Sequence, residues 1–140
     1  MTKQTQSLAQ GRLAVVADDD DDMRTLLATC LRRVGFQVEE ASDGEQLLTI
    51  FSALWADDPR QRLVIVSDIG MPIRDGLEAT RVMRAAAPSL PVILVTAFSD
   101  LATLQAAREV GATNVILKPV DRVAFVQAAL QAVEPARLIG

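Results

Sequence analysis

Charged side chains follow directly after three apolar segments of this sequence. Five consecutive aspartates, residues 18–22, come after the apolar run 13–17, and Asp68 comes after residues 63–67. Lys118 ends a third run, residues 115–117. Carboxylates beside buried segments are costly unless a cation compensates their charge. Oxygen donors of this kind suit a hard divalent ion such as Mg²⁺, and a lysine beside them would offset further negative charge.

Only part of the aspartate run is assigned to this site. Asp20–Asp22 stand at the start of an amphipathic segment, where negative charge favours the positive end of a helix dipole and side chains can cap free N–H groups. Asp18 and Asp19 therefore remain as site candidates. A calcium loop of the EF-hand type starting at Asp18 is excluded, because Met23 replaces its glycine and Thr29 its terminal glutamate.

Two further polar residues end apolar runs. Thr96 follows residues 92–95, although a threonine at the end of a strand is commonplace. Lys118 stands out because lysine is rare beside arginine in this chain, yet a plain salt bridge to an aspartate would explain it from one residue alone. The combination of acid pair, single aspartate, threonine and lysine is more specific than any member of it.

Apolar periodicity predicts the elements that position these residues. Four runs are nearly continuous, as in strands covered on both faces, whereas the second alternates and is expected at a sheet edge. Amphipathic segments separate them; the first has its apolar stripe within residues 23–34 and ends at Gly35. The expected strands cover residues 13–17, 36–41, 63–67, 92–95 and 115–117, and the last helix is expected to bury Val123, Val126, Ala129, Leu130 and Val133.

Five strands that alternate with five helices predict an α/β fold. Such βαβ crossovers build a single five-stranded parallel sheet with helices on both faces. Because ligands bind at the carboxyl ends of parallel strands, the polar residues that end the runs should converge at one edge.

Composition excludes several classes of function. With no histidine and one cysteine, the 140-residue chain has no Ser-His or Cys-His pair, no internal disulfide and no zinc site of the usual kind. The net charge of −4, with scattered basic residues, gives no nucleic-acid footprint. No apolar stretch is long enough to span a membrane, and residues 1–12 lack the pattern of a signal peptide, so we expect a cytoplasmic protein of one domain.

In order, these motifs resemble the receiver domain of response regulators in two-component signalling. The motifs are Val15-Val16-Ala17-Asp18-Asp19 with Met23-Arg24, Ser67-Asp68-Ile69-Gly70-Met71-Pro72 with Asp75-Gly76, Val95-Thr96-Ala97, Gly111-Ala112, and Lys118-Pro119. The resemblance implies the (βα)5 flavodoxin-like receiver fold over residues 13–133, with polar tails at 1–12 and 134–140. We expect a monomer or weak dimer and, from the composition, no direct nucleic-acid or membrane contact.

The resemblance further implies the role of each residue. Asp68 would accept a phosphoryl group from a phosphohistidine on a sensor histidine kinase or a histidine phosphotransfer protein. Lys118 and Thr96 would assist, so the chain would catalyse only its own phosphorylation and dephosphorylation. In phosphoryl transfer the protein mainly positions the reacting groups and neutralises the charge of the phosphoryl oxygens.

A metal site and a cis peptide bond are implied in the same way. By resemblance, Asp18, Asp19, Asp68 and the backbone carbonyl of Gly70 would hold Mg²⁺. The bond before Pro119 would be cis, which proline makes only modestly costly, about 0.5–1 kcal/mol.

Departures from the family pattern concern regulation. Val115 stands where the family usually has an aromatic switch residue, so we expect the signal to leave through the loop after Thr96, which carries Phe98. Ser67 stands where an aliphatic residue is common, and a hydrogen bond to backbone is its expected role. Trp55 is expected to close the core, with a partner-binding anchor as the alternative.

Three other functions agree less well with the sequence. A haloacid-dehalogenase-like phosphatase also uses an aspartyl phosphate, but its nucleophile ends the first strand and its acid pair comes late. A degenerate receiver acting as a docking module would not need every site side chain, and all are present here. A flavodoxin-like nucleotide binder lacks support, since no glycine-rich loop follows the first strand.

Overall fold

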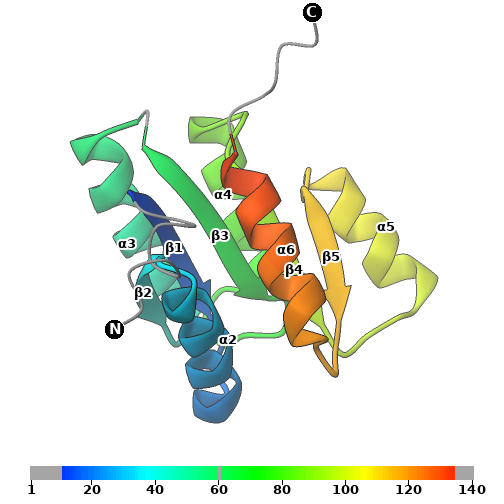
Figure 1. Ribbon diagram of the computed structural model, residues 1–140. Coiled ribbons are helices and arrows are strands. Elements are labelled where there is room, and N and C mark those ends of the chain that lie inside the picture. The colour runs from blue at the N-terminus through cyan, green and yellow to red at the C-terminus, as the bar shows by residue number, and fades with distance from the viewer. Residues whose placement is uncertain (1–10, 60, 135–140) are drawn as a thin grey trace, which may run out of the picture.

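Five parallel strands form one sheet in the order β2-β1-β3-β4-β5 (Figure 1), in a computed structural model that describes residues 11–59 and 61–134. This confirms the predicted fold; most of the expected tails 1–12 and 134–140 lies outside the described residues. The strands are β1 (Arg12–Ala17), β2 (Gln37–Ala41), β3 (Arg62–Asp68), β4 (Val92–Thr96) and β5 (Asn114–Leu117). The helices are α2 (Asp21–Arg33), α3 (Gly44–Asp57), α4 (Gly76–Ala86), α5 (Leu101–Glu109) and α6 (Arg122–Val133).

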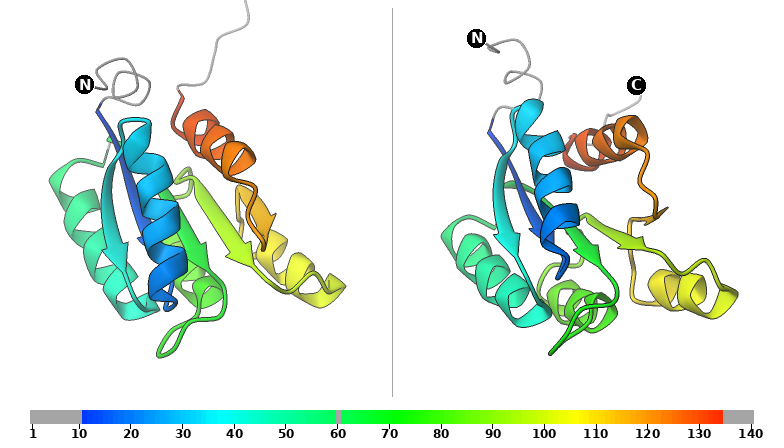
Figure 2. Two further views of the ribbon diagram at one scale, coloured as in Figure 1. Left: turned by 60° about the horizontal axis from the view of Figure 1, so that its bottom comes forward. Right: turned by 90° about the horizontal axis from the view of Figure 1, so that it is seen from below.

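Helices cover both faces of the sheet (Figures 1 and 2). Helices α2 and α6 share one apolar core, and α3, α4 and α5 share the other. The two faces divide the residues of β1 alternately, so that Val15 and Ala17 pack towards α3 while Ala14 and Val16 pack towards α2. This double coverage explains why the central strands are almost wholly apolar. Among the helices of the described segments, none has the length and apolar character needed to cross a bilayer.

Every helix of the described residues begins at an aspartate cap. Each cap side chain accepts a backbone N–H from the first turn of its helix, a contribution worth about 1 kcal/mol apiece. Because each helix follows a strand, the caps gather at the carboxyl edge of the sheet. Much of the negative charge at that edge therefore serves helix initiation. The cap residues are Asp20, Asp43, Asp75, Asp100 and Asp121.

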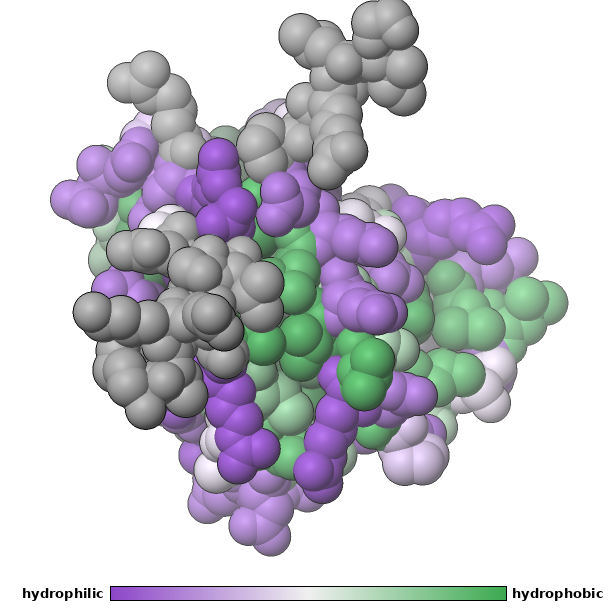
Figure 3. Space-filling model, in the orientation of Figure 1, coloured by the Kyte–Doolittle hydropathy of each residue, from purple (hydrophilic) through white to green (hydrophobic). Residues whose placement is uncertain are grey.

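The two edges of the sheet differ from each other. Strand β2 lies at one edge, as predicted, and its burial alternates from Gln37 to Glu40, before the buried Ala41. The prediction that residues 115–117 are covered on both faces is wrong, because β5 is the other edge strand and Leu117 is 44 % exposed. A short edge strand has a neighbour on one side only, so apolar composition alone does not guarantee burial. Apolar surface is visible in Figure 3 over the region of α5 and β5.

The apolar stripe predicted for α6 needs a partial correction. Val123 is 68 % exposed, whereas Phe125, Ala129 and Val133 form the buried row. Almost the whole helix is apolar, so its sequence allows more than one stripe at helical spacing. The bulky Phe125 ring, fully buried, fixes the rotation of the helix towards the sheet.

Arg84 links several backbone segments at the opposite edge of the sheet, where the strands begin. Its Nη1 donates to the carbonyls of Ala87, Pro88 and Leu90 at 3.2, 2.9 and 2.6 Å, and its Nη2 donates to the carbonyl of Gly111 at 2.6 Å. One side chain thus joins the end of α4 to the segments that lead into β4 and β5.

Trp55 closes the core at the same end of the molecule, in agreement with the core interpretation. Its ring stacks on Phe51 with centroids 5.7 Å apart, and it packs against the α3 side of the core.

Candidate functional site

Three carboxylate side chains meet at the edge of the sheet formed by the C-terminal ends of the strands. Asp18 follows β1 and Asp68 ends β3; the pairing of Ala17 with Ser67 brings the two side by side. One carboxylate oxygen from each of Asp18, Asp19 and Asp68 lies within 4.8 Å of the others. Asp18 is fully buried and Asp68 is 9 % exposed, whereas Asp19 is exposed. The structure thus brings the predicted acidic residues together.

Lys118 reaches into this cluster from the end of β5. Its Nζ lies 3.3 Å from Oδ2 of Asp18 and 3.2 Å from Oδ1 of Asp68, so one ammonium bridges the two buried acids. The backbone N–H of Lys118 donates to the carbonyl of Thr96 at 2.8 Å, which holds the lysine loop to β4. The peptide bond between Lys118 and Pro119 is cis.

The electrostatics of the cluster reflect burial and crowding. Burial raises the pKa of the Asp68 carboxyl above its ordinary value, and the charge of Asp18 acts in the same direction against the opposing effect of Lys118. Burial alone would lower the pKa of Lys118, but the charges of Asp68 and Asp18 outweigh it and raise that pKa. The lysine therefore stays charged, while an ionised Asp68 is held at a cost in free energy that added positive charge would relieve.

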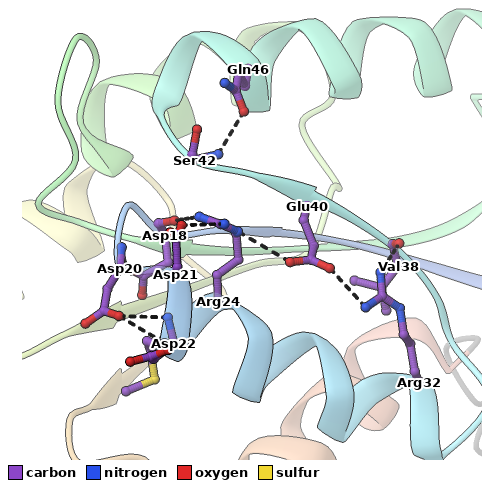
Figure 4. Close-up of polar contacts among 11 residues, drawn as sticks. Asp18, Asp20, Asp21, Asp22, Arg24, Arg32, Val38, Glu40, Ser42 and Gln46 are labelled. Atoms are coloured by element: carbon purple, nitrogen blue, oxygen red, sulfur yellow. Dashed lines mark hydrogen bonds and ion pairs between the residues drawn. The ribbon is translucent and has the colours of Figure 1, made fainter.

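Hydrogen bonds to backbone groups hold both the side chain and the backbone of Asp18 in place. Oδ1 of Asp18 accepts the N–H of Asp20 at 2.9 Å, and the N–H of Asp18 donates to Ala41 of β2 at 3.0 Å. Asp20 in turn caps α2, accepting the N–H groups of Asp22 and Met23 (Figure 4). The prediction that the later aspartates serve the helix is confirmed for Asp20.

Thr96 stands at the same edge of the sheet, one residue beyond the Val95 that pairs with Asp68. It is 1 % exposed, and its hydroxyl oxygen accepts the N–H of Phe98 at 3.0 Å. Across residues 11–59 and 61–134, no hydrogen bond joins Thr96 to the acidic cluster. Phe98 itself is 59 % exposed, and Val115 is half-buried in β5.

Two glycines beside Asp68 have different surroundings. Gly70, whose carbonyl was expected as a metal ligand, is exposed, and an added Cβ there would meet nothing within 4 Å. At Gly76 an added Cβ would collide with the carbonyl oxygen of Asp68. The same carbonyl accepts the hydroxyl of Ser67 at 2.9 Å, as expected for that serine. Gly76 belongs to the sequence motif and begins α4, but its close approach to the Asp68 carbonyl depends on tertiary packing, which the sequence alone does not predict.

The donor set fits a hard divalent cation. It consists of carboxylate oxygens, the ligands that Mg²⁺ prefers, and their mutual distances allow them to share one ion. Two donors are buried and the third is open to solvent, which leaves room for water ligands. The site combines a cluster of carboxylates, a compensating ammonium and a place for a cation, which is a set suited to binding an anionic group.

Comparison with known proteins agrees with this geometry. The family model "Response regulator receiver domain" matches residues 14–130. The chain is 34 % identical over 107 residues to regulatory protein AtoC of Escherichia coli, covering 76 % of this chain and 22 % of AtoC. It is 36 % identical over 122 residues to the C4-dicarboxylate transport transcriptional regulatory protein DctD of Rhizobium meliloti, covering 87 % of this chain and 25 % of DctD. The chain thus spans about a quarter of the length of these two relatives.

Solved structures show the same fold. The receiver domain of NtrX from Brucella abortus is 27 % identical with a TM-score of 0.75, over 88 % of this chain and 99 % of that one. The signal receiver domain of the response regulator NarL from Mycobacterium tuberculosis is also 27 % identical, with a TM-score of 0.76 over 89 % and 97 % of the two chains. The chain therefore belongs to the response regulator receiver domain family.

Proposed function

We propose that this chain is a phospho-acceptor in two-component signalling, with Asp68 as the residue that receives the phosphoryl group. The observation that carries the proposal is the meeting of Asp68 with Asp18, Asp19 and the ammonium of Lys118 at one sheet edge. The donor would be a phosphohistidine on a sensor histidine kinase or a histidine phosphotransfer protein, because this chain has no histidine of its own. It would act on itself and not as an enzyme on other substrates.

The transfer is a displacement at phosphorus. A carboxylate oxygen of Asp68 forms the new O–P bond while the N–P bond of the donor breaks. The electron pair of that bond stays on the imidazole nitrogen, which takes up a proton. Lys118, 3.2 Å from Asp68, is placed to offset the charge of the phosphoryl oxygens, and it holds the carboxylate in one orientation.

Asp18, Asp19, Asp68 and the carbonyl of Gly70 are the proposed ligands of Mg²⁺. When bound, the ion would supply positive charge that neutralises both the carboxylates and the phosphoryl oxygens. Asp18 is held by the N–H of Asp20 and by Lys118, so its position does not depend on the ion.

The output route is proposed to start at Thr96. Its hydroxyl oxygen accepts the N–H of Phe98, so a hydroxyl that turned to the phosphoryl group would release this loop contact. Val115 is too short to provide the two side-chain positions that an aromatic residue there would give. The signal would then leave by movement of the loop that carries Phe98 and the start of α5.

The experiment is phosphorylation by a small-molecule donor such as phosphoramidate, followed by intact mass. Wild-type protein with Mg²⁺ should gain one phosphoryl group, and Asp68→Asn should gain none. Asp57→Asn, an exposed aspartate at the far end of α3, is the matched control and should be labelled as wild type. Equal labelling of Asp68→Asn, or labelling that chelator leaves unchanged, would contradict the proposal.

Phosphoryl uptake together with an assay of phosphomonoester hydrolysis separates the alternatives. A haloacid-dehalogenase-like phosphatase would hydrolyse added phosphomonoesters, and a degenerate docking module would take up no phosphoryl group.

The relative NtrC of Klebsiella pneumoniae is named a DNA-binding transcriptional regulator, and the chain matches 23 % of its length. We propose that this chain corresponds to the receiving part of such a regulator, without nucleic-acid contacts of its own.

A further inference from the structure

Arg24 joins the acidic site to two other elements through a single guanidinium. Its Nη1 donates to the backbone carbonyl of Asp18 at 2.8 Å, its Nη2 to Oδ1 of Asp21 at 2.6 Å, and its Nε to Oε1 of Glu40 at 3.3 Å (Figure 4). The side chain is 17 % exposed, so these contacts are partly shielded from water. Three acceptors on the loop after β1, on α2 and on β2 thus share one planar group.

Glu40 anchors this guanidinium to the edge strand. Its second oxygen accepts Nη1 of Arg32 at 2.9 Å, and Nη2 of Arg32 donates to the carbonyl of Val38 at 3.0 Å. A network of charge-assisted hydrogen bonds therefore runs from the Asp18 carbonyl through Arg24 and Glu40 to the far end of α2 (Figure 4). Arg32 belongs to this network but does not contact Asp18, so a variant of Arg32 is a suitable control for a variant of Arg24.

The contact with the Asp18 carbonyl matters because of what shares its peptide plane. The carbonyl of Asp18 and the N–H of Asp19 belong to one rigid unit, so turning the carbonyl would also turn the backbone from which the Asp19 side chain projects. Within the described part of the chain, no hydrogen bond or ion pair holds the Asp19 carboxylate. The orientation of the Asp19 carboxylate consequently depends on the conformation of its own backbone.

We infer that Arg24 is a positioning residue. It fixes the peptide plane between Asp18 and Asp19, and thereby orients the Asp19 carboxylate towards the cation site. The inference rests on the proposed function, since it concerns the affinity of that site for Mg²⁺. Lysine could not replace arginine here, because a single ammonium cannot present three donors in one plane to acceptors on three elements.

The test is a Mg²⁺ titration measured by calorimetry. Thermal unfolding in chelator, measured alongside, shows whether each variant is folded. Arg24→Met should weaken Mg²⁺ binding about tenfold, within the range typical when a group that orients a metal ligand is lost. Saturating Mg²⁺ should then restore phosphorylation of Asp68 by phosphoramidate towards the wild-type rate. Arg32→Met is the matched control: it also loses an ion pair to Glu40, yet should bind Mg²⁺ within about twofold of wild type.

The outcomes separate the inference from the proposed function. Arg24→Met that binds Mg²⁺ like wild type, or Arg32→Met that is weakened equally, would overturn the positioning role alone. Wild-type protein that binds no Mg²⁺ would overturn the role together with the proposed metal site. If Arg24→Met does not fold, Arg24→Lys keeps the charge and much of the stem, and should still bind Mg²⁺ more weakly than Arg32→Met does.

Discussion

Replacing Gly76 by alanine should damage both the fold and the site. Alanine normally favours a helix over glycine by up to about 1 kcal/mol. Here, however, the new Cβ would overlap the Asp68 carbonyl oxygen and come within 3.0 Å of the Ser67 hydroxyl oxygen. Overlap with backbone requires α4 or the end of β3 to shift, and overpacking of this kind typically costs 1–3 kcal/mol. We expect a net loss of about 2 kcal/mol in the free energy of unfolding.

The assay is thermal and urea unfolding of matched variants. At roughly 2–4 °C per kcal/mol for a domain near this size, Gly76→Ala should lower Tm by about 4–8 °C. Gly70→Ala is the control, since its Cβ would meet no atom within 4 Å, and its stability should change by no more than about 0.5 kcal/mol. Because the displaced carbonyl belongs to Asp68, phosphorylation of Gly76→Ala should also slow. A Gly76→Ala protein as stable as wild type would refute the packing argument, as would an equal loss in Gly70→Ala.

Three further predictions follow from the same edge of the sheet. In chelator at neutral pH, Asp68→Asn should unfold at a higher temperature than wild type; the raised pKa of Asp68 means that its charge opposes folding, so the difference should shrink as pH falls through that pKa. Asp20→Ala should lower the free energy of unfolding by about 1 kcal/mol through loss of the α2 cap, and an unchanged urea midpoint would contradict the capping role. Amide exchange with a stable phosphoryl mimic should change within residues 97–110, and changes confined to the loops holding Asp68 and Lys118 would exclude the proposed output route.

The sequence predicted the sheet and the main site residues because both depend on strong local patterns. Central strands of a parallel sheet are apolar on both faces, and polar residues that end such strands must meet at one edge. Asp18, Asp68 and Lys118 are recognisable in this way although 100 residues separate the first from the last.

Contacts that depend on tertiary packing could not be read from the sequence. Arg24 meets Glu40 only because α2 packs beside β2, and Gly76 is close to the Asp68 carbonyl only because of how α4 packs on β3. The rotation of α6 was ambiguous for a different reason: its residues are apolar almost throughout, and the fit of Phe125 decides between several possible stripes.

The carbonyl contacts of Arg84 imply that the two ends of the molecule respond differently to solvent conditions. Its acceptors at Ala87, Pro88, Leu90 and Gly111 are uncharged, so acid does not remove them. Asp68 near Lys118, by contrast, has a raised pKa, so protonation of this carboxyl relieves the crowding of the acidic cluster. In the absence of metal, mild acid should therefore increase the protection of the loops at the C-terminal ends of the strands, while the turns that lead into β4 and β5 keep theirs. The response to pH would then be concentrated at one end of the domain.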